Sequence, residues 1–491
     1  MINISNFKID RNLDPIKQNK ILVNFIQKFV NHKNLDDLLL KLSKIYKIPK
    51  DNFDQDVKLL IFSNYRNSKG KFLSKYGFIQ IFNSFFKYTL FFLWLVIFSK
   101  NNKNLKTKKY DLIIDDVDHP DTLWRFKSFV NQFRSHIFVT TFKPVGESHY
   151  FWDNYRGLDR KISLNHFLKA LVLIFMSLKN SLIDRTDYIG IIFTLNRKII
   201  KYHNIFSKIQ SDYLIQDRHF MSSSLKNYIF KKHKGKKTLL YQRNIAQLNG
   251  PGMYTCADYF FSMGNKTHIQ YLKCNSKFEK IFPVGSFFMN SVKIKKNFKS
   301  EVPKFDLLHI ASNMNHFQNT HTTFLDDWYE QFKWLIYFKK KFPEYKVGIK
   351  GRENDGLRKN KKFMNLIKNS SIIFVDIFND SKDKSFKYNS RHSYDFAFEA
   401  KVNCTWQSTL GFELIGHGKP CIFLDPGGRN IAHLPNDNYH SIIKVKSYNE
   451  FEDEFFKIIR NNSKFSNLNT DDYCINSNLT HQKIYEILNK N

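Results

Sequence analysis

A short turn near the C-terminal end of the sequence has the residue types that bind phosphate groups. It reads VNCTWQSTLGFELIGHGKPCIFLD over residues 402–425, which predicts a strand, a turn, a short helix and a second strand. Ser408 and Thr409 suit the cap of a helix, and Gly411 permits close approach of a ligand to the backbone. The N–H groups at such a helix start suit a diphosphate, although the turn of an ordinary β-α-β unit without a ligand would have the same sequence pattern. Glu413 follows about one turn later, within reach of a sugar hydroxyl.

Cationic and polar side chains follow two other strand-like runs of the same half. Lys350 and Arg352 end the run YKVGIKGREN, where they would neutralise phosphate charge or simply lie in solvent. Ser312 and Asn313 stand in the loop after KFDLLHIA and could add phosphate contacts. The sequence therefore gathers candidate phosphate ligands at several strand ends of its C-terminal half.

Candidates for a general base stand after the first two predicted strands of the N-terminal half. The first strand, KKYDLIIDDVD, ends in acidic residues, and a second acidic position lies in the loop PVGESHYF. A base near an acceptor hydroxyl is usually a carboxylate or a histidine, but a solvated turn has the same composition. The candidates are Asp115, Asp116, Asp118, His119, Glu147 and His149.

Two α/β halves would position these residues. Strand and helix patterns alternate over residues 105–290 and include SHIFVTTF and the strand-like DYIGIIFTL (187–195). The polar, basic stretch 291–304 predicts a linker, and the alternation restarts over 305–470. This predicts an α/β fold of two Rossmann-like domains, with ligand expected in a cleft at the carboxyl ends of the strands.

Residues 1–104 predict helices, among them the most apolar segment of the protein. It reads GFIQIFNSFFKYTLFFLWLVIFSK. Its uncharged portion, residues 88–98, would extend about 16 Å as a helix, roughly half of a bilayer core. A full crossing would place Lys87 in hydrocarbon, which is costly. We expect residues 78–98 to associate with an anionic membrane surface; a buried core helix and a true span are the alternatives.

Composition narrows the class of partner. The chain has 491 residues, long enough for two domains, and 78 Lys and Arg against 44 Asp and Glu give a net charge of +34. The charge favours an anionic partner, but the basic residues are dispersed and no nucleic-acid-binding motif is present, so nucleic acid is not expected. The five cysteines are scattered and form no C-x-x-C pair, which predicts a reducing, cytoplasmic setting.

The segment HSYDFAFEAKVNCTWQSTLGFELIGHGKPCIFLD resembles the donor-binding segment of GT-B glycosyltransferases. These enzymes build bacterial surface polysaccharides such as capsule and lipopolysaccharide, and CDP-glycerol polymer transferases are more distantly similar. Their pattern is a strand, Ser-(Ser/Thr)-x-Gly-x-Glu, a helix of small residues, Gly-Lys-Pro and a strand. KVGIKGREN and the Gly-Ser pair in FPVGSFF are also similar to parts of these enzymes. The resemblance covers roughly residues 105–460 and is weaker in the first half.

The resemblance implies roles for individual residues. Ser408, Thr409 and the backbone at Leu410 and Gly411 would hold the donor diphosphate, and Glu413 would bind the ribose. Lys350 and Arg352 would neutralise phosphate, and Ser312 and Asn313 would add contacts. No metal and no other cofactor is implied, because side chains and a helix end do that work on this scaffold.

Two departures from the family pattern bear on mechanism. Gly351-Arg352 stands where many relatives carry His-Pro, and Thr405 stands where retaining enzymes often carry a second glutamate. These departures favour an inverting, metal-independent enzyme or a remote family.

The expected protein is a cytoplasmic glycosyltransferase, peripheral to the inner face of the plasma membrane. It would transfer a sugar from a nucleotide-sugar donor to a lipid-linked or growing surface polysaccharide. The expected partners are that donor, that acceptor and an anionic membrane surface, and not nucleic acid. A CDP-polyol phosphotransferase, a UDP-sugar 2-epimerase and a non-catalytic export scaffold remain as alternatives.

Overall fold

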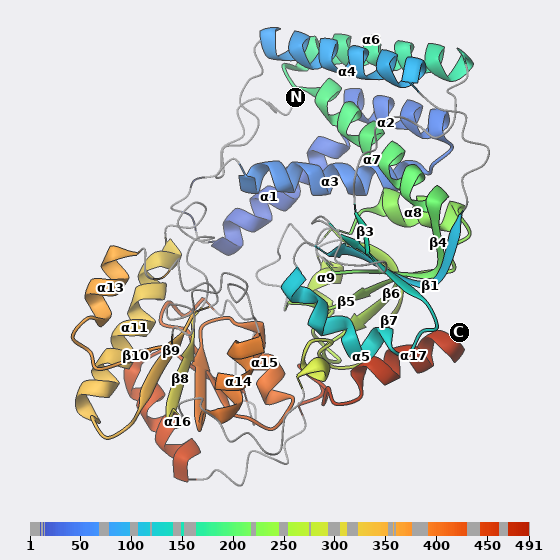
Figure 1. Ribbon diagram of the computed structural model, residues 1–491. Coiled ribbons are helices and arrows are strands. Elements are labelled where there is room, and N and C mark those ends of the chain that lie inside the picture. Colours follow the sequence, from blue (N-terminus) through green and yellow to red (C-terminus); the bar gives the residue numbers. More distant parts are fainter. Residues whose placement is uncertain are drawn as a thin grey trace, which may run out of the picture.

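The computed structural model contains two parallel β-sheets, each covered by helices, and a further group of helices beside the first sheet (Figure 1). The structure describes residues 10, 13, 15–67, 78–98, 107–117, 120–140, 149–151, 164–217, 222–244, 254–273, 276–292, 305–311, 323–351, 357, 360–375, 391–429, 442–460 and 470–490. All statements below concern these residues.

The first sheet has seven strands in the order β3-β2-β1-β4-β5-β6-β7, and every neighbouring pair is parallel. Its inner strands are mostly buried, as expected where helices cover both faces of a parallel sheet. The strands are β1 (Lys108–Val117), β2 (His136–Thr140), β3 (His149–Phe151), β4 (Ile209–Gln216), β5 (Lys237–Tyr241), β6 (Cys256–Ser262) and β7 (Lys277–Pro283). Its short helices include η2 (Pro120–Phe126), α5 (Lys127–Val130), α8 (Ser224–Lys232), α9 (Ile269–Lys273) and η4 (Met289–Ser291).

The second sheet has six strands in the order β10-β9-β8-β11-β12-β13, again all parallel. The strands are β8 (Leu307–Ile310), β9 (Val347–Lys350), β10 (Ile373–Phe374), β11 (Val402–Thr405), β12 (Cys421–Leu424) and β13 (Ile442–Val445). The helices are α11 (Thr323–Lys341), α13 (Lys361–Ile367), α14 (Arg391–Glu399), α15 (Thr409–Ile415) and α16 (Tyr448–Arg460).

Counted from its own first strand, each sheet begins with the order 3-2-1-4-5-6, which defines the doubly wound Rossmann-like fold. The expected fold class is therefore confirmed: α/β, with two Rossmann-like domains and an N-terminal helical segment. In such sheets ligands bind at the carboxyl ends of the strands, near the point where the strand order reverses.

The predicted strand at 187–195 is wrong. These residues begin the helix α7 (Tyr188–Lys208), whose cap Asp187 accepts a hydrogen bond from the Gly190 N–H at 2.8 Å. The buried positions recur every three or four residues as far as Phe206, which is a helical period. The strand of this part of the chain is β4, directly after the helix, and its sequence IQSDYLIQ has polar residues that obscured it.

A group of long helices stands on one side of the first domain (Figure 1). It shares one hydrophobic core with β1, β2, β4 and α8. Two of its members, α4 and α6, lie side by side at the end of the molecule farthest from the second domain (Figure 1). The helices are α1 (Pro15–Val30), α2 (Lys33–Tyr46), α3 (Lys50–Asn67), α4 (Phe78–Phe98), α6 (Leu164–Asp184) and α7.

The C-terminal segment returns from the second domain to the first. Its helix α17 (Thr480–Lys490) packs on α5, and the Ser128 Oγ and His481 Nδ1 atoms are 2.7 Å apart. This segment also lies against the chain that leaves β7: the Thr480 hydroxyl donates to the Val284 carbonyl at 2.8 Å. Gly285 has a φ of +97°, and a Cβ there would lie 2.8 Å from the Ile475 carbonyl oxygen. The two connections between the domains are thus in contact.

Candidate active site at the strand ends

Asp115 and Asp116 lie near the end of strand β1, within a β-bulge or similar irregularity. Successive strand residues normally point to opposite faces, but the register of β1 against β2 shifts between Ile114 and Val117. Asp116 has a φ of +59°, a left-handed conformation that aspartate tolerates better than most residues. The bulge lets both carboxylates reach the same cation, a use of bulges that is common beside functional sites.

That cation is the ammonium group of Lys226. Its Nζ lies 2.6 Å from Asp115 Oδ2 and 2.6 Å from Asp116 Oδ2. The side chain of Asp115 is 3% exposed and that of Asp116 is 23% exposed, so Asp116 is the member that reaches solvent. Burial and the charge of Asp116 raise the pKa of Asp115 to about 6, against the opposing effect of Lys226. The pair is therefore held together by one buried lysine.

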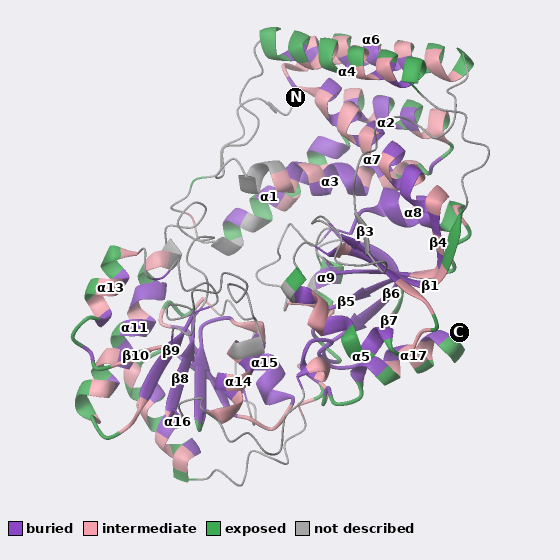
Figure 2. Cartoon of the chain, in the orientation of Figure 1, coloured by how far each residue is buried: buried purple, intermediate pink, exposed green. Residues whose placement is uncertain are grey.

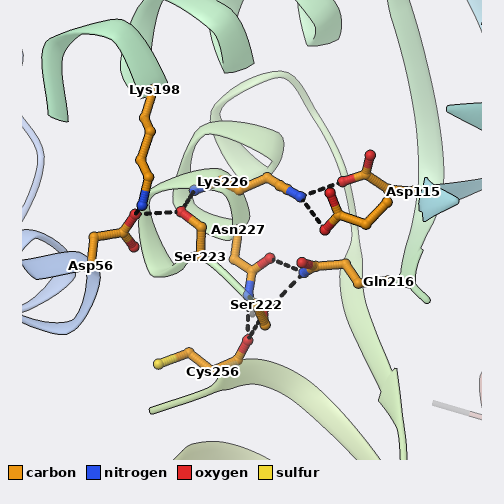
Figure 3. Close-up of polar contacts among 10 residues, drawn as sticks. Asp56, Asp115, Lys198, Gln216, Ser222, Ser223, Lys226, Asn227 and Cys256 are labelled. Atoms are coloured by element: carbon orange, nitrogen blue, oxygen red, sulfur yellow. Dashed lines mark hydrogen bonds and ion pairs between the residues drawn. The ribbon is translucent and has the colours of Figure 1, made fainter. Parts of the chain in front are cut away.

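Lys226 is positioned by the start of α8 (Figure 3). The cap residue Ser223 accepts from the Lys226 N–H at 3.2 Å and donates to Asp56 Oδ2 at 2.7 Å. Asp56, on α3, is fully buried and also pairs with Lys198 of α7 at 2.9 Å. One polar network thus connects the N-terminal helices to the end of β1.

Two arginines lie near the carboxyl ends of β1 and β5. The guanidinium of Arg125, in η2, lies 4.1 Å from the centre of the Phe288 ring, and that of Arg243 lies 5.7 Å from it. Asp217, the residue after β4, accepts a hydrogen bond from the Tyr241 hydroxyl and lies 3.5 Å from Arg243 Nη1. Burial and the charge of Arg243 lower the pKa of Arg125. This edge of the first sheet therefore holds two neighbouring positive charges, of which Arg125 is buried and Arg243 is half-buried.

Glu413 of α15 lies where the two domains meet. Its carboxylate accepts from the Ser286 hydroxyl, on the chain after β7, and from the Tyr394 hydroxyl of α14 at 2.9 Å. The residue is 2% exposed, and burial raises its pKa to about 7, against the two hydrogen bonds and the nearby charge of Arg125. In this structure the carboxylate expected to bind a ribose is joined to both domains.

The turn before α15 forms as the sequence predicts. Ser408 caps the helix, and its Oγ accepts from the Leu410 N–H at 3.3 Å. Thr409 is the first helical residue. A Cβ on Gly411 would lie 3.0 to 3.1 Å from side chains of Thr405, Phe423 and Cys421. The missing side chain at 411 therefore lets α15 pack closely on β11 and β12.

Lys350 is the last residue of β9, at the carboxyl end of the second sheet. It is 4% exposed, and its Nζ donates to the Gly351 carbonyl at 2.9 Å. An ammonium group is rarely buried to this degree without a compensating anion nearby. Lys350 is thus in the place that the sequence predicts for a phosphate ligand.

Six of the predicted site residues lie outside the described residues. They are Asp118, His119, Glu147, Ser312, Asn313 and Arg352. His149 belongs to β3, and its side chain is outside the description as well. Their roles stay predictions.

Sequence reasoning missed Arg125, Asp217, Arg243 and Tyr394, and noted Ser286 only as part of a Gly-Ser pair. Arg243 follows a predicted strand by two residues, so its position at a strand end was a usable signal. Asp217 follows β4, which was not predicted, and Tyr394 reaches Glu413 from a separate helix.

No protein-family model and no curated protein matches the sequence. Among solved structures, the chain is similar to UDP-GlcNAc 2-epimerase from Neisseria meningitidis bound to UDP-GlcNAc, at 10% identity and a TM-score of 0.45 over 78% of this chain and 100% of that one. The enzyme from Methanocaldococcus jannaschii gives 11% and 0.46 over 78% and 100%. The wall teichoic acid polymerase TagF gives 9% and 0.43 over 89% and 97%. Similarity at this level concerns the path of the chain and carries no information about a substrate.

Proposed function

We propose that this protein is an inverting glycosyltransferase that uses a nucleotide-diphosphate sugar as its donor. One observation carries the proposal: buried or half-buried cations lie near the carboxyl ends of strands in both sheets. Arg125 and Arg243 belong to the first sheet and Lys350 to the second. Because this edge is where doubly wound sheets bind ligands, a diphosphate between the domains would face positive charge from both.

The charge balance of the junction also supports an anionic ligand. Arg125 and Arg243 face Asp217 and Glu413, but the raised pKa of Glu413 leaves it partly protonated near neutral pH. Protonation of Glu413 would remove a negative charge near these arginines, and a bound diphosphate would supply negative charge there.

Asp116 is the described residue best placed to act as general base. It lies one residue before the end of β1, is the more exposed member of the acidic pair, and its carboxylate is 2.6 Å from Lys226 Nζ. In the proposed step the acceptor hydroxyl gives its proton to a carboxylate, and its oxygen bonds to the anomeric carbon. The bond from that carbon to the diphosphate oxygen breaks, and the nucleoside diphosphate leaves with the electron pair.

The proposed acceptor is a lipid-linked or growing surface polysaccharide on the cytoplasmic side of the membrane. The four described cysteines are free and buried, which suits a reducing compartment. The strongly basic chain suits an acceptor with a phosphate-linked lipid.

A thermal-shift panel of UDP, GDP, CDP, CMP and ADP tests the donor site. At about 100 times its dissociation constant, the true nucleotide should add about 2.7 kcal/mol of stability. Lys350→Gln should lose most of this shift. Lys444→Gln is the matched control, because Lys444 is also a buried lysine of the second sheet but lies within β13. If no nucleotide shifts the native protein, the proposal fails.

The nucleotide preference in this panel, together with activity assays on the same protein, separates the alternative functions. A preference for CDP would favour a polyol-phosphate transferase. Interconversion of free UDP-sugars without acceptor would identify an epimerase. Nucleotide binding with no turnover on any lipid-linked acceptor would leave a non-catalytic role.

A further inference from the structure

The helices α4 and α6 expose a continuous set of large apolar side chains. Figure 2 shows their outer surfaces as largely exposed, whereas the helices beneath them are mostly buried or intermediate. We call this set the apolar platform. On α4 it comprises Phe78, Ile79, Phe82, Phe86, Leu90, Leu93, Val96 and Ile97, and on α6 it comprises Leu164, Leu168, Val172, Phe175 and Ile183.

The platform occupies one side of each helix. At about 100° of rotation per residue, the platform residues of each helix fall within an arc of about 120°. Phe98, the last residue of α4, is also exposed and lies outside that arc. The opposite side is buried along the whole length, at Ile81, Tyr88, Phe92 and Leu95 in α4 and from Ala170 to Ser181 in α6. Each helix is therefore apolar on both sides, one facing protein and the other exposed.

Specific polar contacts fix the inner sides to the protein. In α4, the Ser84 hydroxyl donates to Asp187 Oδ2 at 2.9 Å, and the Tyr88 hydroxyl accepts from Asn196 Nδ2 at 2.5 Å. In α6, Asn180 Nδ2 donates to the Asn34 carbonyl at 3.1 Å. These contacts lie in the middle of the pair and at the end where α4 begins and α6 ends, so neither helix is free to be surrounded by lipid.

These inner contacts distinguish two orientations of α4 and α6: lying in the plane of a membrane and crossing it. By length and composition both helices could span a bilayer. A crossing helix, however, would expose the inner polar partners Asp187, Asn196 and Asn34 to hydrocarbon or lose them. Lying in the plane leaves these contacts intact and buries only the platform.

The charges beside the platform identify its occupant. The helices α4 and α6 carry Lys87, Lys169 and Lys179, all exposed. Their one acidic residue, Asp184, is the last residue of α6 and accepts hydrogen bonds from Asn34 and Tyr188 on the protein side. A second copy of the chain would bring the same lysines into opposition at a self-complementary interface. An anionic lipid surface would instead attract them.

We propose that α4 and α6 together form a docking surface that lies flat on an anionic lipid bilayer, with the apolar platform inserted below the headgroups. This inference does not depend on the proposed transfer reaction. The proposed surface combines α4, the apolar segment 78–98, with α6. The sequence had placed the residues of α6 within the first α/β domain.

Flotation of the full chain with vesicles tests the surface. The native protein should float with phosphatidylcholine vesicles that contain about one-third phosphatidylglycerol, and less with phosphatidylcholine alone. The double variant Leu90→Glu with Leu168→Glu should bind at least about tenfold more weakly, because two inserted side chains become charged. Both leucines are exposed, so thermal unfolding should be unchanged.

The control makes the same chemical change elsewhere. Leu272→Glu with Leu479→Glu replaces two exposed leucines outside the platform and should float like the native protein. Equal flotation of the native and platform variants, or no flotation of the native protein, would overturn the proposal. So would a native dimer that the platform variant dissociates and that binds no vesicles.

Spin labels at Ile79→Cys, Phe86→Cys and Leu93→Cys measure orientation. The positions are two turns apart, about 10 Å along the helix. A flat helix gives the same shallow depth at all three, whereas a crossing helix gives depths that differ by about that step. The second result would contradict the in-plane arrangement.

Discussion

Two buried carboxylate sites of this protein, at Asp115 and at Glu413, differ in what faces the negative charge. In the first domain, one buried ammonium group, Lys226, contacts both Asp115 and Asp116. Between the domains, Glu413 is contacted by the neutral hydroxyls of Ser286 and Tyr394, and Arg125 acts only from farther away. The first site is a closed ion network within one domain, and the second is a hydrogen-bonded contact across two.

This difference shows how a buried carboxylate can have two different roles in one protein. The carboxylates paired with a lysine belong to a network that fixes local structure, including the link through Ser223 to Asp56 on α3. Burial raises the pKa of Asp115 to about 6 against the opposing effect of Lys226, and it raises the pKa of Glu413, which only hydroxyls contact, to about 7. Glu413 therefore titrates closer to neutral pH than Asp115 does.

Removing Lys226 should have the largest effect. Lys226→Met leaves two carboxylates with no cation in a buried site, and we expect a loss of roughly 3–5 kcal/mol in the free energy of unfolding. Urea denaturation measures it. Lys231→Met, on the same helix but with a side chain 41% exposed, should cost at most about 1 kcal/mol. Similar losses for both variants would show that the buried Lys226 network contributes no more to stability than an exposed ion pair does.

The pH dependence of Glu413 comes next. Its pKa is raised in the folded state, so its contribution to stability is fully present below about 4.5 and is lost as the pH rises through about 7. Between these values the native protein should lose roughly 2–4 kcal/mol relative to Glu413→Gln. Urea midpoints across this range give the difference, and Asp115 cancels because both proteins contain it. A constant difference would contradict the raised pKa.

The two helix caps provide the smallest contrast. Ser223→Ala removes the cap of α8 and a hydrogen bond to buried Asp56, and should cost about 2 kcal/mol. Ser408→Ala removes only the bond to the Leu410 N–H and should cost about 1 kcal/mol. A larger loss of stability for Ser408→Ala than for Ser223→Ala, in thermal or urea unfolding, would contradict this prediction.

Local pattern was enough to predict most of the architecture. Apolar runs bounded by charged or glycine residues located β1, β2, β9, β11 and β12, and the turn at Ser408 formed as expected. The pattern failed at 187–195, where an apolar run long enough for a strand is the first turns of a longer helix. The buried positions Tyr188, Ile191, Ile192 and Leu195 have the spacing of a helix, and the same spacing continues as far as Phe206.

The candidate site was less accessible to sequence reasoning because its contacts are long-range. Glu413 meets Ser286, which is 127 residues away, and Lys226 meets Asp115, which is 111 residues away. The periodic patterns that predict helices and strands do not predict a contact between residues so far apart in the sequence. The position of a charged residue directly after a strand is the one local signal, and it pointed to Asp116 and Lys350 but missed Asp217.

The contact between the two interdomain connections has a mechanical consequence. Val284–Ser286 and residues 475–480 touch, with the Ser286 N–H donating to the Ser477 hydroxyl at 2.8 Å. Each connection between the domains is therefore fixed by the other, so a change in the path of one would disturb the hydrogen bonds of both. The bond from Ser286 to Glu413 extends this paired crossing to α15, so the helix after the Ser408 turn is tied to the place where the chain leaves the first domain.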